Sequence, residues 1–288
     1  MDEPPIRDVS DTAFWIAHHR ALESRRPDAL FRDPLAEHLA GDSGAKIAAA
    51  MPNAALIGWS VAIRTHIIDS YIGWALSNGV DTVLNLGAGL DTRPYRMALP
   101  ASLHWIEADF ARIIEYKEAL LQQEHPRCHT QRIKIDLADR TLRQNLFARV
   151  NAEADSVLVL TEGVVPYSSE EAAGLLADDL RANAHMRYWL VDYFSPQAIK
   201  YRMRSGMTRT MQNAPFRFAP EDWSGFFRQH GWRASQMRYL AEEGMQLGRP
   251  MPLPWLAKAL VKIWSPFLTR ERLAAMRNFA GYGLLEPC

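Results

Sequence analysis

The stretch NLGAGLDTRPYR, residues 85–96, is the strongest indication of the fold in the middle of the chain. Two glycines, Gly87 and Gly89, end the strand-like run 80–86, a pattern typical of a chain that turns tightly beside a bound nucleotide. Working outward, β-rich runs alternate with longer helical segments, at residues 80–86, 103–108, 131–135, 155–161 and 187–194. This alternation predicts a doubly wound α/β fold with a mostly parallel sheet.

The flanks of this middle region are expected to be helical or irregular. Residues 12–23 and 57–76 carry apolar side chains at helical spacings, and Asp33-Pro34 has the form of a helix cap followed by proline. Residues 250–272, beginning MPLPW, predict an amphipathic insertion that serves as a lid, a homodimer contact, a membrane-surface helix or ordinary packing. We therefore expect a single domain made of a helical cap (1–78), a core sheet (79–249 and 273–288) and a lid (250–272).

Composition limits the class of protein. The 33 basic and 33 acidic residues cancel, which argues against a nucleic-acid partner. The two cysteines, Cys128 and Cys288, have no C-x-x-C partner, so we expect a reduced, cytoplasmic protein without a metal. No apolar run reaches the roughly 18 residues of a membrane span, and none is expected.

The glycine turn fits a dinucleotide poorly. A dinucleotide loop needs a small residue three positions after Gly89, where this chain has Thr92 followed by Arg93 and Pro94. A P-loop is excluded because no Gly-Lys-Ser/Thr follows. S-adenosylmethionine, which has no phosphate, would tolerate the loop, while a nicotinamide oxidoreductase stays an alternative.

An acid for the ribose hydroxyls of such a ligand should end the next strand, about 20 residues downstream of the glycines. Glu107 and Asp109 both fit, because alternate residues of a strand point to the same side. A solvated acid or a helix cap is the other interpretation of Asp109.

These motifs resemble a known family. LNLGAGLDTRPYR, IEADF and TEGVVPYSSEEA, together with the segments 12–36 and 62–72, are similar to the leucine carboxyl methyltransferase family, in particular its bacterial branch of S-adenosylmethionine-dependent and polyketide O-methyltransferases. The resemblance runs from about residue 12 to residue 194. It implies a class I methyltransferase fold, which is Rossmann-like, with N-terminal helices, a helical lid and S-adenosyl-L-methionine as cofactor.

The resemblance also implies roles for single residues. Arg64 would hold the methionine carboxylate, because the planar guanidinium group matches the geometry of a carboxylate. The rest of the methionine portion would lie against the backbone of Gly87 and Gly89. Asp109, rather than Glu107, would bind the ribose. The remaining implied contacts are Asp136 and Leu137 for the adenine and Glu162 near the amino group, with Asp91 either assisting there or capping its own turn. From the residues alone, Asp136 would be a helix cap.

The methyl acceptor is less defined than the cofactor. Tyr167 resembles the family tyrosine that contacts an acceptor carboxylate, although a packing role is the alternative. The resemblance favours O-methylation of a carboxylate, or of a hydroxyl, in a small molecule such as a polyketide-like metabolite. The alternatives are a protein C-terminal carboxyl group as substrate and a protein that binds the cofactor without catalysis. The Trp, Phe, Met and Arg content of the first helix and of the two C-terminal insertions, 198–214 and 250–272, suggests an apolar acceptor with an acidic group.

Overall fold

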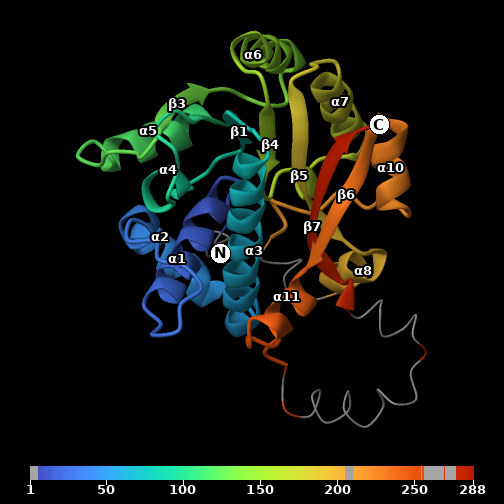
Figure 1. Ribbon diagram of the computed structural model, residues 1–288. Coiled ribbons are helices and arrows are strands. Elements are labelled where there is room, and N and C mark those ends of the chain that lie inside the picture. Colours follow the sequence, from blue (N-terminus) through green and yellow to red (C-terminus); the bar gives the residue numbers. More distant parts are fainter. Residues whose placement is uncertain (1–5, 205–210, 254, 256–268, 270–276) are drawn as a thin grey trace.

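The computed structural model describes residues 6–204, 211–253, 255, 269 and 277–288, and in this part of the chain one seven-stranded sheet runs through the molecule (Figure 1). The strands are β1 (Thr82–Leu86), β2 (His104–Asp109), β3 (His129–Lys134), β4 (Val157–Thr161), β5 (Met186–Phe194), β6 (Trp232–Tyr239) and β7 (Ala280–Pro287). Their order is β3-β2-β1-β4-β5-β7-β6. Strands β1 to β5 pair in parallel, whereas β7 is antiparallel to β5 and to β6.

Both faces of this sheet are covered, as expected for parallel strands that read as apolar throughout. Every residue of β1 and of β4 is buried. One face packs against α6 (Arg140–Glu153), α7 (Glu170–Arg181) and α10 (Trp223–Gln229), and the other packs against α3 (Ala54–Ser77). The predicted doubly wound α/β fold with a mostly parallel sheet is therefore confirmed.

The remaining helices lie mainly at one edge of the sheet or in its connections. They are α1 (Asp11–Ser24), α2 (Ala36–Ala50), α4 (Arg93–Arg96), α5 (Ala111–Leu120), the 3-10 turn η1 (Val165–Tyr167), α8 (Pro196–Arg204) and α11 (Leu240–Gln246). Among the described residues, no helix is long and apolar enough to cross a bilayer.

Helix α3 joins the sheet to the N-terminal helices. Its 24 residues span about 36 Å, far longer than the five residues of β1. The part from Ile63 onward packs on the sheet, whereas Ile57 and Val61 belong to a separate apolar cluster with α1 and α2. The first half of α3 therefore supports α1 and α2 at the edge where β1 and β4 end (Figure 1).

Several local expectations change in the structure. Asp33 does not cap α2, because its side chain pairs with buried Arg20 of α1, and α2 begins only at Ala36 without a side-chain cap. Most of the expected lid at 250–272 lies outside the described residues.

The connection order creates a topological switch point. The chain places β2 and β3 on one side of β1 and then crosses back to place β4 and β5 on the other side. Loops that leave the carboxyl ends of β1 and β4 diverge at such a point, which is where open α/β sheets bind ligands. The turn that begins at Gly87 and the acid Glu162 both follow these strands directly.

Candidate active site

The turn after β1 requires glycine for two separate reasons. Gly87 and Gly89 have φ angles of 67° and 50°, in the left-handed region that side chains disfavour. A Cβ on Gly87 would also lie only 2.4 Å from Cγ2 of Val164, which follows β4. The space beside Gly87 is thus taken by Val164, and the turn packs tightly against the β4 loop.

Asp109 ends β2 and is joined to the glycine turn. Its Oδ2 accepts a hydrogen bond from the Gly89 N–H at 2.7 Å, and its Oδ1 accepts one from the Phe110 N–H at 2.7 Å. Burial raises the pKa of Asp109, although the two backbone donors oppose that shift. Each oxygen still has a lone pair for a further donor, so the carboxylate can bind a pair of hydroxyl groups.

Glu107, the other acid of β2, is used differently. Its carboxylate is fully buried and pairs with the Lys117 Nζ at 2.7 Å and with the Arg132 Nε at 2.9 Å. These partners come from α5 and from the neighbouring strand β3, and they occupy both oxygens. Glu107 is therefore engaged within the fold, whereas the contact of Asp109 with the ribose stays a prediction.

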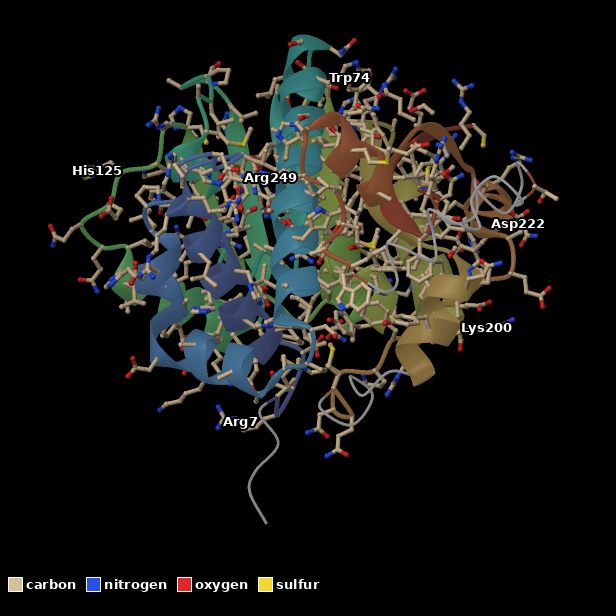
Figure 2. All side chains as sticks on the ribbon, turned by 90° about the horizontal axis from the view of Figure 1, so that it is seen from below. Arg7, Trp74, His125, Lys200, Asp222 and Arg249 are labelled. Carbon is tan, nitrogen blue, oxygen red and sulfur yellow. The ribbon has the colours of Figure 1, made fainter. Side chains whose placement is uncertain are left out.

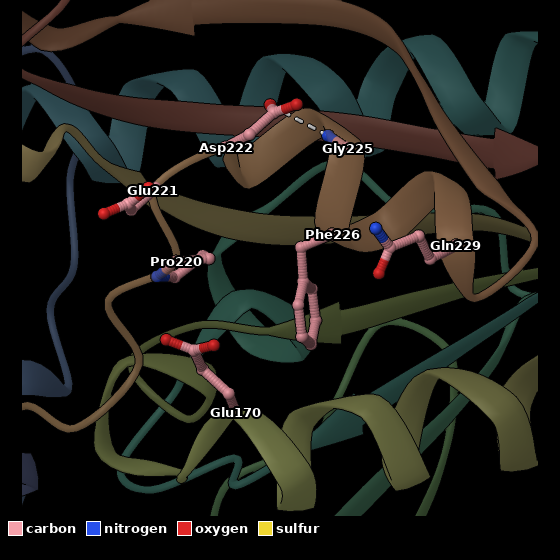
Figure 3. A pocket seen from close by; sticks show the side chains of 7 residues that line it. All are labelled: Glu170, Pro220, Glu221, Asp222, Gly225, Phe226 and Gln229. Carbon is pink, nitrogen blue, oxygen red and sulfur yellow. Dashed lines mark hydrogen bonds between the residues drawn. The ribbon is translucent and has the colours of Figure 1, made fainter.

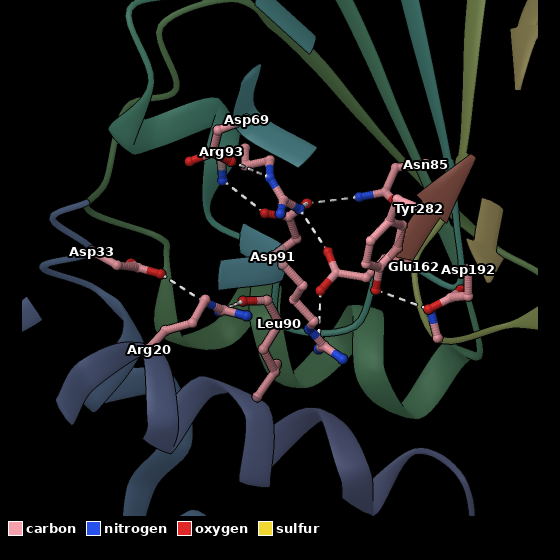
Figure 4. Close-up of polar contacts among 12 residues, drawn as sticks. Arg20, Asp33, Asp69, Asn85, Leu90, Asp91, Arg93, Glu162, Asp192 and Tyr282 are labelled. Atoms are coloured by element: carbon pink, nitrogen blue, oxygen red, sulfur yellow. Dashed lines mark hydrogen bonds and ion pairs between the residues drawn. The ribbon is translucent and has the colours of Figure 1, made fainter. Parts of the chain in front are cut away.

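Arg93 of α4 connects the loops after β1 and β4 (Figure 4). Its Nη1 lies 2.7 Å from Asp91 Oδ2 and 3.0 Å from Glu162 Oε2, and its Nε lies 2.8 Å from Asp69 Oδ1 of α3. Only 3% of the Arg93 side chain is exposed. Pro94 stands in the first turn of this helix, where the missing N–H of proline costs no hydrogen bond.

Asp91 forms the turn between the glycines and α4. Its Oδ1 accepts from the Arg93 backbone N–H at 2.9 Å, and its Oδ2 accepts from Asn85 Nδ2 as well as from the Arg93 side chain. Burial alone would raise the pKa of Asp91, but the Arg93 guanidinium holds it below the ordinary value. Of its two predicted roles, the cap of the turn is observed, and a contact with the cofactor stays a prediction.

Arg64 and Glu162 form an ion pair at the switch point. The Arg64 Nη2 lies 2.9 Å from Glu162 Oε1, and both side chains are largely buried. Burial would raise the pKa of Glu162, but Arg64 and Arg93 outweigh it, and the carboxyl stays ionised. The Arg64 Nε is buried and has no hydrogen-bond partner among the residues that the structure describes.

These groups belong to a larger set of buried charges, which we call the ion network. Asp69 also binds Arg96 of α4, through bonds of 2.6 and 2.8 Å. Arg20 of α1 pairs with Asp33 at 2.8 Å and donates from Nη2 to the Leu90 carbonyl oxygen at 2.5 Å (Figure 4). The network consists of Arg20, Asp33, Asp69, Asp91, Arg93, Arg96, Glu162 and Arg64.

The sequence predicted site roles for only three of these eight residues, Arg64, Asp91 and Glu162, and took Asp33 for a helix cap. Arg93 is part of the DTR string that carries the resemblance, so its position could have suggested a role. Arg20, Asp69 and Arg96 lie in ordinary helical patterns, and their partners are distant in sequence. Nothing in the local sequence marks them as buried charges.

Asp192 of β5 was also missed. Its Oδ2 accepts from the Gly163 N–H at 2.9 Å, and its Oδ1 accepts from the hydroxyl of Tyr282 at 2.9 Å. Burial raises the pKa of Asp192 to about 6. Because Gly163 directly follows Glu162, this carboxyl fixes the backbone that presents Glu162 (Figure 4).

The two residues expected to contact adenine follow β3. Asp136 is exposed, and its Oδ1 accepts from the Ala138 N–H at 2.9 Å. The cap of α6 is Asp139, which accepts from the Leu142 N–H at 3.0 Å, so the interpretation of Asp136 as a helix cap is wrong. Leu137 is half-buried against the sheet cluster. The Ile135 N–H bonds to the Asp109 carbonyl at 2.9 Å, which holds this loop beside Asp109.

Tyr167 lies where the switch point meets an apolar cluster. Its ring packs edge-on to Phe216 at 5.0 Å between centroids. We call the cluster the cap cluster; its buried members are Ile6, Trp15, Ile47, Met51, Ile57, Val61, Met211 and Ala214, with Tyr167 packed against them. The predicted packing role of Tyr167 is thus observed, and contact with an acceptor stays a prediction.

Two hollows lie away from these residues. A groove of about 570 Å³ runs between α1, α3 and the segment 248–252, with Arg249 beside α3 (Figure 2). The residues of α3 that line this groove include Ala55 and Ala62. Both lie on roughly the opposite side of the helix from Arg64, so the groove does not open toward Arg64. A hollow of about 210 Å³ lies between α7 and α10 (Figure 3). Neither hollow is lined by a predicted site residue.

Comparison with known proteins decides the family. The leucine carboxyl methyltransferase family matches residues 13–181, more than half of the chain. The chain belongs to this family. A curated relative from Streptomyces coelicolor is 31% identical over 261 residues, which cover 83% of this chain and 88% of the relative. Another, from Streptomyces avermitilis, is 30% identical and covers 84% and 89%. Both names place these relatives among the S-adenosyl-L-methionine-dependent methyltransferases.

Solved structures confirm the fold of this methyltransferase. A DUF574-family protein from Streptomyces avermitilis has a TM-score of 0.56 at 13% identity, covering 94% of this chain and 97% of that one. A protein from Thermobifida fusca has a TM-score of 0.55 at 15% identity, covering 93% and 94%. The fold is the class I methyltransferase fold, and the cofactor is S-adenosyl-L-methionine. Family membership thus overturns the nicotinamide alternative.

Proposed function

We propose that this methyltransferase methylates an oxygen of a small apolar acceptor, most readily a carboxylate and otherwise a hydroxyl. The observation that carries this proposal is that two unlike regions share one side of α3, where Ile57 and Val61 of the cap cluster precede Arg64 by seven and three positions. The first region is the Arg64–Glu162 pair, and the second is the apolar cap cluster. A charged cofactor tail fits the first region, and an apolar acceptor fits the second. In this proposal residues 1–78 form a helical cap that also supplies Arg64 to the cofactor, and residues 79–249 and 273–288 form the core sheet.

The geometry fits S-adenosylmethionine. Arg64 keeps a buried, unpartnered Nε among the described residues, and a guanidinium edge of this kind suits the methionine carboxylate. Glu162 would balance the ammonium group, and the turn at Gly87 and Gly89 would line the methionine portion. Asp109, held by two backbone donors, would accept the ribose hydroxyls.

The adenine would lie between the loop after β3 and the sheet. Asp136 is exposed and one of its oxygens is free of the Ala138 bond, so it can accept from an exocyclic amine. Leu137 would present its half-buried apolar face to the ring. Asp91 would act indirectly, by fixing Arg93 and the turn.

The chemistry demands little of the protein beyond alignment. The bound cofactor supplies a methyl group activated by positively charged sulfur. The chain then has to hold the acceptor oxygen in line and exclude water. A carboxylate, with an ordinary pKa of about 4, is already ionised at neutral pH and needs no base, whereas a phenol with a pKa of about 10 would benefit from one. Tyr167, at the junction of the two regions, would position that oxygen.

Calorimetry with S-adenosylhomocysteine tests the cofactor half of the proposal. We expect binding in the micromolar range for the wild type and at least about tenfold weaker binding for Arg64→Ala and Asp109→Ala. Arg233→Ala is the matched control, because this exposed arginine pairs with Glu286 on the β6–β7 side of the sheet. No heat from the wild-type protein, or equal affinity in all variants, would contradict the assigned cofactor site.

Methyl transfer tests the acceptor half. The wild-type protein is incubated with labelled S-adenosylmethionine and with apolar carboxylates, phenols and a peptide ending in a free carboxylate, and the products are read by mass spectrometry. We expect methyl esters of the small carboxylates. Methylation of the peptide alone would favour a protein substrate, and cofactor binding without any product would favour a non-catalytic protein.

A further inference from the structure

The peptide unit between Leu137 and Ala138 is held at both ends. Its carbonyl oxygen accepts a hydrogen bond from Nη1 of Arg143 at 2.7 Å. Its N–H donates to Oδ1 of Asp136 at 2.9 Å. Because a peptide unit is planar, the bond from Arg143 also sets the direction of that N–H, and with it which oxygen of Asp136 is engaged.

Arg143 is fixed in turn by a second helix. It lies near the start of α6 and is only 6% exposed, and its Nε and Nη2 both bond to Oδ2 of Asp179 in α7. These two nitrogens form one edge of a planar guanidinium group, so the contact with Asp179 also fixes the direction of Nη1 on the other edge. The donor that holds Leu137 is therefore oriented by a residue outside the loop.

The charge of Asp179 strengthens this arrangement. Burial would raise the pKa of Asp179, but the hydrogen bonds from Arg140, Gln144 and Arg143 outweigh it and lower the pKa, so the carboxyl stays ionised. The bond from a charged guanidinium group to the Leu137 carbonyl is charge-assisted, and such bonds are stronger than those between neutral groups.

We propose that Arg143 is a positioning residue for the cofactor, which acts through the Leu137–Ala138 peptide to orient Asp136 toward the exocyclic amine of adenine. This inference rests on the proposed function, in which Asp136 and Leu137 contact the adenine. It goes beyond it by making Arg143 a determinant of the preference for adenine over other purines.

The exposure of Asp136 explains why such a support is needed. Water competes for an exposed carboxylate, so the single bond from the Ala138 N–H holds it only while that N–H keeps its direction. Adenine presents an amine donor at position 6, where a 6-oxopurine presents an acceptor. A carboxylate held in place at that position accepts from the first and repels the second, whereas a freely rotating one distinguishes them poorly.

Arg140 supplies a matched control. It belongs to the same helix and pairs with the same carboxylate, with its Nη2 3.0 Å from Oδ1 of Asp179, but half of its side chain is exposed and its hydrogen bonds within the described residues do not reach Leu137. Asp179 keeps one arginine and Gln144 in either single variant. A role confined to the packing of α6 on α7 would leave the base preference unchanged in both variants.

The test measures by calorimetry the affinity for S-adenosylhomocysteine and for S-inosylhomocysteine, in which an oxygen replaces the amine. We expect the wild type to prefer S-adenosylhomocysteine by at least about tenfold. Arg143→Met should lose most of this preference, because it binds S-adenosylhomocysteine about tenfold more weakly and S-inosylhomocysteine within about twofold of the wild type. Arg140→Met should keep the preference. A preference within about twofold of the wild type in Arg143→Met, or the same loss in Arg140→Met, overturns the inference.

A second variant covers the case in which Arg143→Met does not fold. Arg143→Met combined with Asp179→Met removes both charges of the buried pair together, an exchange that folded proteins often tolerate. This double variant should show the same loss of preference for S-adenosylhomocysteine. The wild-type preference in the double variant overturns the inference.

Asp136→Ala separates this inference from the proposed function. The variant should lose the preference for S-adenosylhomocysteine, and adding Arg143→Met to it should lower the preference no further. An unchanged preference in Asp136→Ala, or no binding of S-adenosylhomocysteine to the wild type, counts against the proposed adenine contact and overturns the inference with it. Loss of the preference in Asp136→Ala together with the wild-type preference in Arg143→Met overturns the inference alone.

Discussion

The ion network and the cap cluster meet at the same edge of the sheet but are built in opposite ways. The network pairs four buried arginines with four acids, and most of its members have two or more charged partners. The cap cluster is apolar, draws on segments from residue 6 to residue 214, and contains a donor without a partner. An invariant, charged ligand such as the cofactor suits a rigid set of paired charges. The proposed apolar acceptor suits an apolar region that can repack.

The largest effect is expected from Arg93→Leu. Asp69 and Glu162 keep Arg96 and Arg64 as partners, but Asp91 would keep only two neutral donors, the Asn85 amide and the backbone N–H of residue 93, and would lose its charged partner. We expect a loss of about 3–5 kcal/mol in the free energy of unfolding, measured by urea denaturation. A loss below about 1 kcal/mol would show that the network does not act as a unit.

The second-largest effect is expected from Asp192, whose titration makes the free energy of unfolding depend on pH. Its pKa is raised from 3.8 to about 6, so between these values the native state holds a proton that the unfolded state has lost. The native state is therefore destabilised as pH rises through this window, by up to about 3 kcal/mol above pH 6. Asp192→Asn removes this titration.

The measurement compares the unfolding free energies of the wild type and Asp192→Asn from pH 4 to pH 8. We expect the variant to gain stability relative to the wild type as pH rises, whatever its stability at pH 4. A difference that is constant across the range would mean that the carboxyl of Asp192 keeps an ordinary pKa in the folded protein.

A smaller effect separates the two acids of β2. Asp109→Asn is expected to weaken S-adenosylhomocysteine binding by about tenfold, which corresponds to about 1.4 kcal/mol, because the ribose hydroxyls lose a charged acceptor. Glu107→Gln is the matched control, since Glu107 is occupied by Lys117 and Arg132. Its affinity should stay within about twofold. Calorimetry on both variants checks this, and a larger loss for Glu107→Gln would reverse the assignment.

The smallest effect is expected from Arg112→Ala. Arg112 of α5 pairs with Asp8 at 2.9 Å, and both side chains are about half exposed. Solvent screens such a pair, so we expect a change below about 1 kcal/mol in thermal unfolding. A loss comparable with that of Arg93→Leu would remove the distinction between the buried network and the surface pairs around it.

Much of the fold could be predicted from the sequence, because strands and turns depend mainly on residues that are close together in the chain. Runs of Val and Leu such as residues 157–160 predict buried parallel strands, and the structure buries every residue of β4. Asp109 was expected at the end of the next strand, about 20 residues downstream of the glycines, and its carboxylate accepts a hydrogen bond from the Gly89 N–H. The prediction that Asp33 caps a helix was wrong. Its carboxylate pairs with the buried Arg20 of another helix instead of accepting from the N–H groups at the start of α2.

By itself the sequence determined the order of strands and helices, the glycine turn after β1 and the acid that ends β2. Each of these depends on residues close together in the chain, whose backbone preferences and burial patterns act independently of the rest. Only the tertiary structure decided which charges pair and which segments form the cap cluster. Arg93 pairs with Glu162, which lies 69 residues further along the chain, and the cap cluster contains both Ile6 and Met211. Side chains select such partners by distance in space, and a buried charge has to find an opposite charge wherever the fold brings one near.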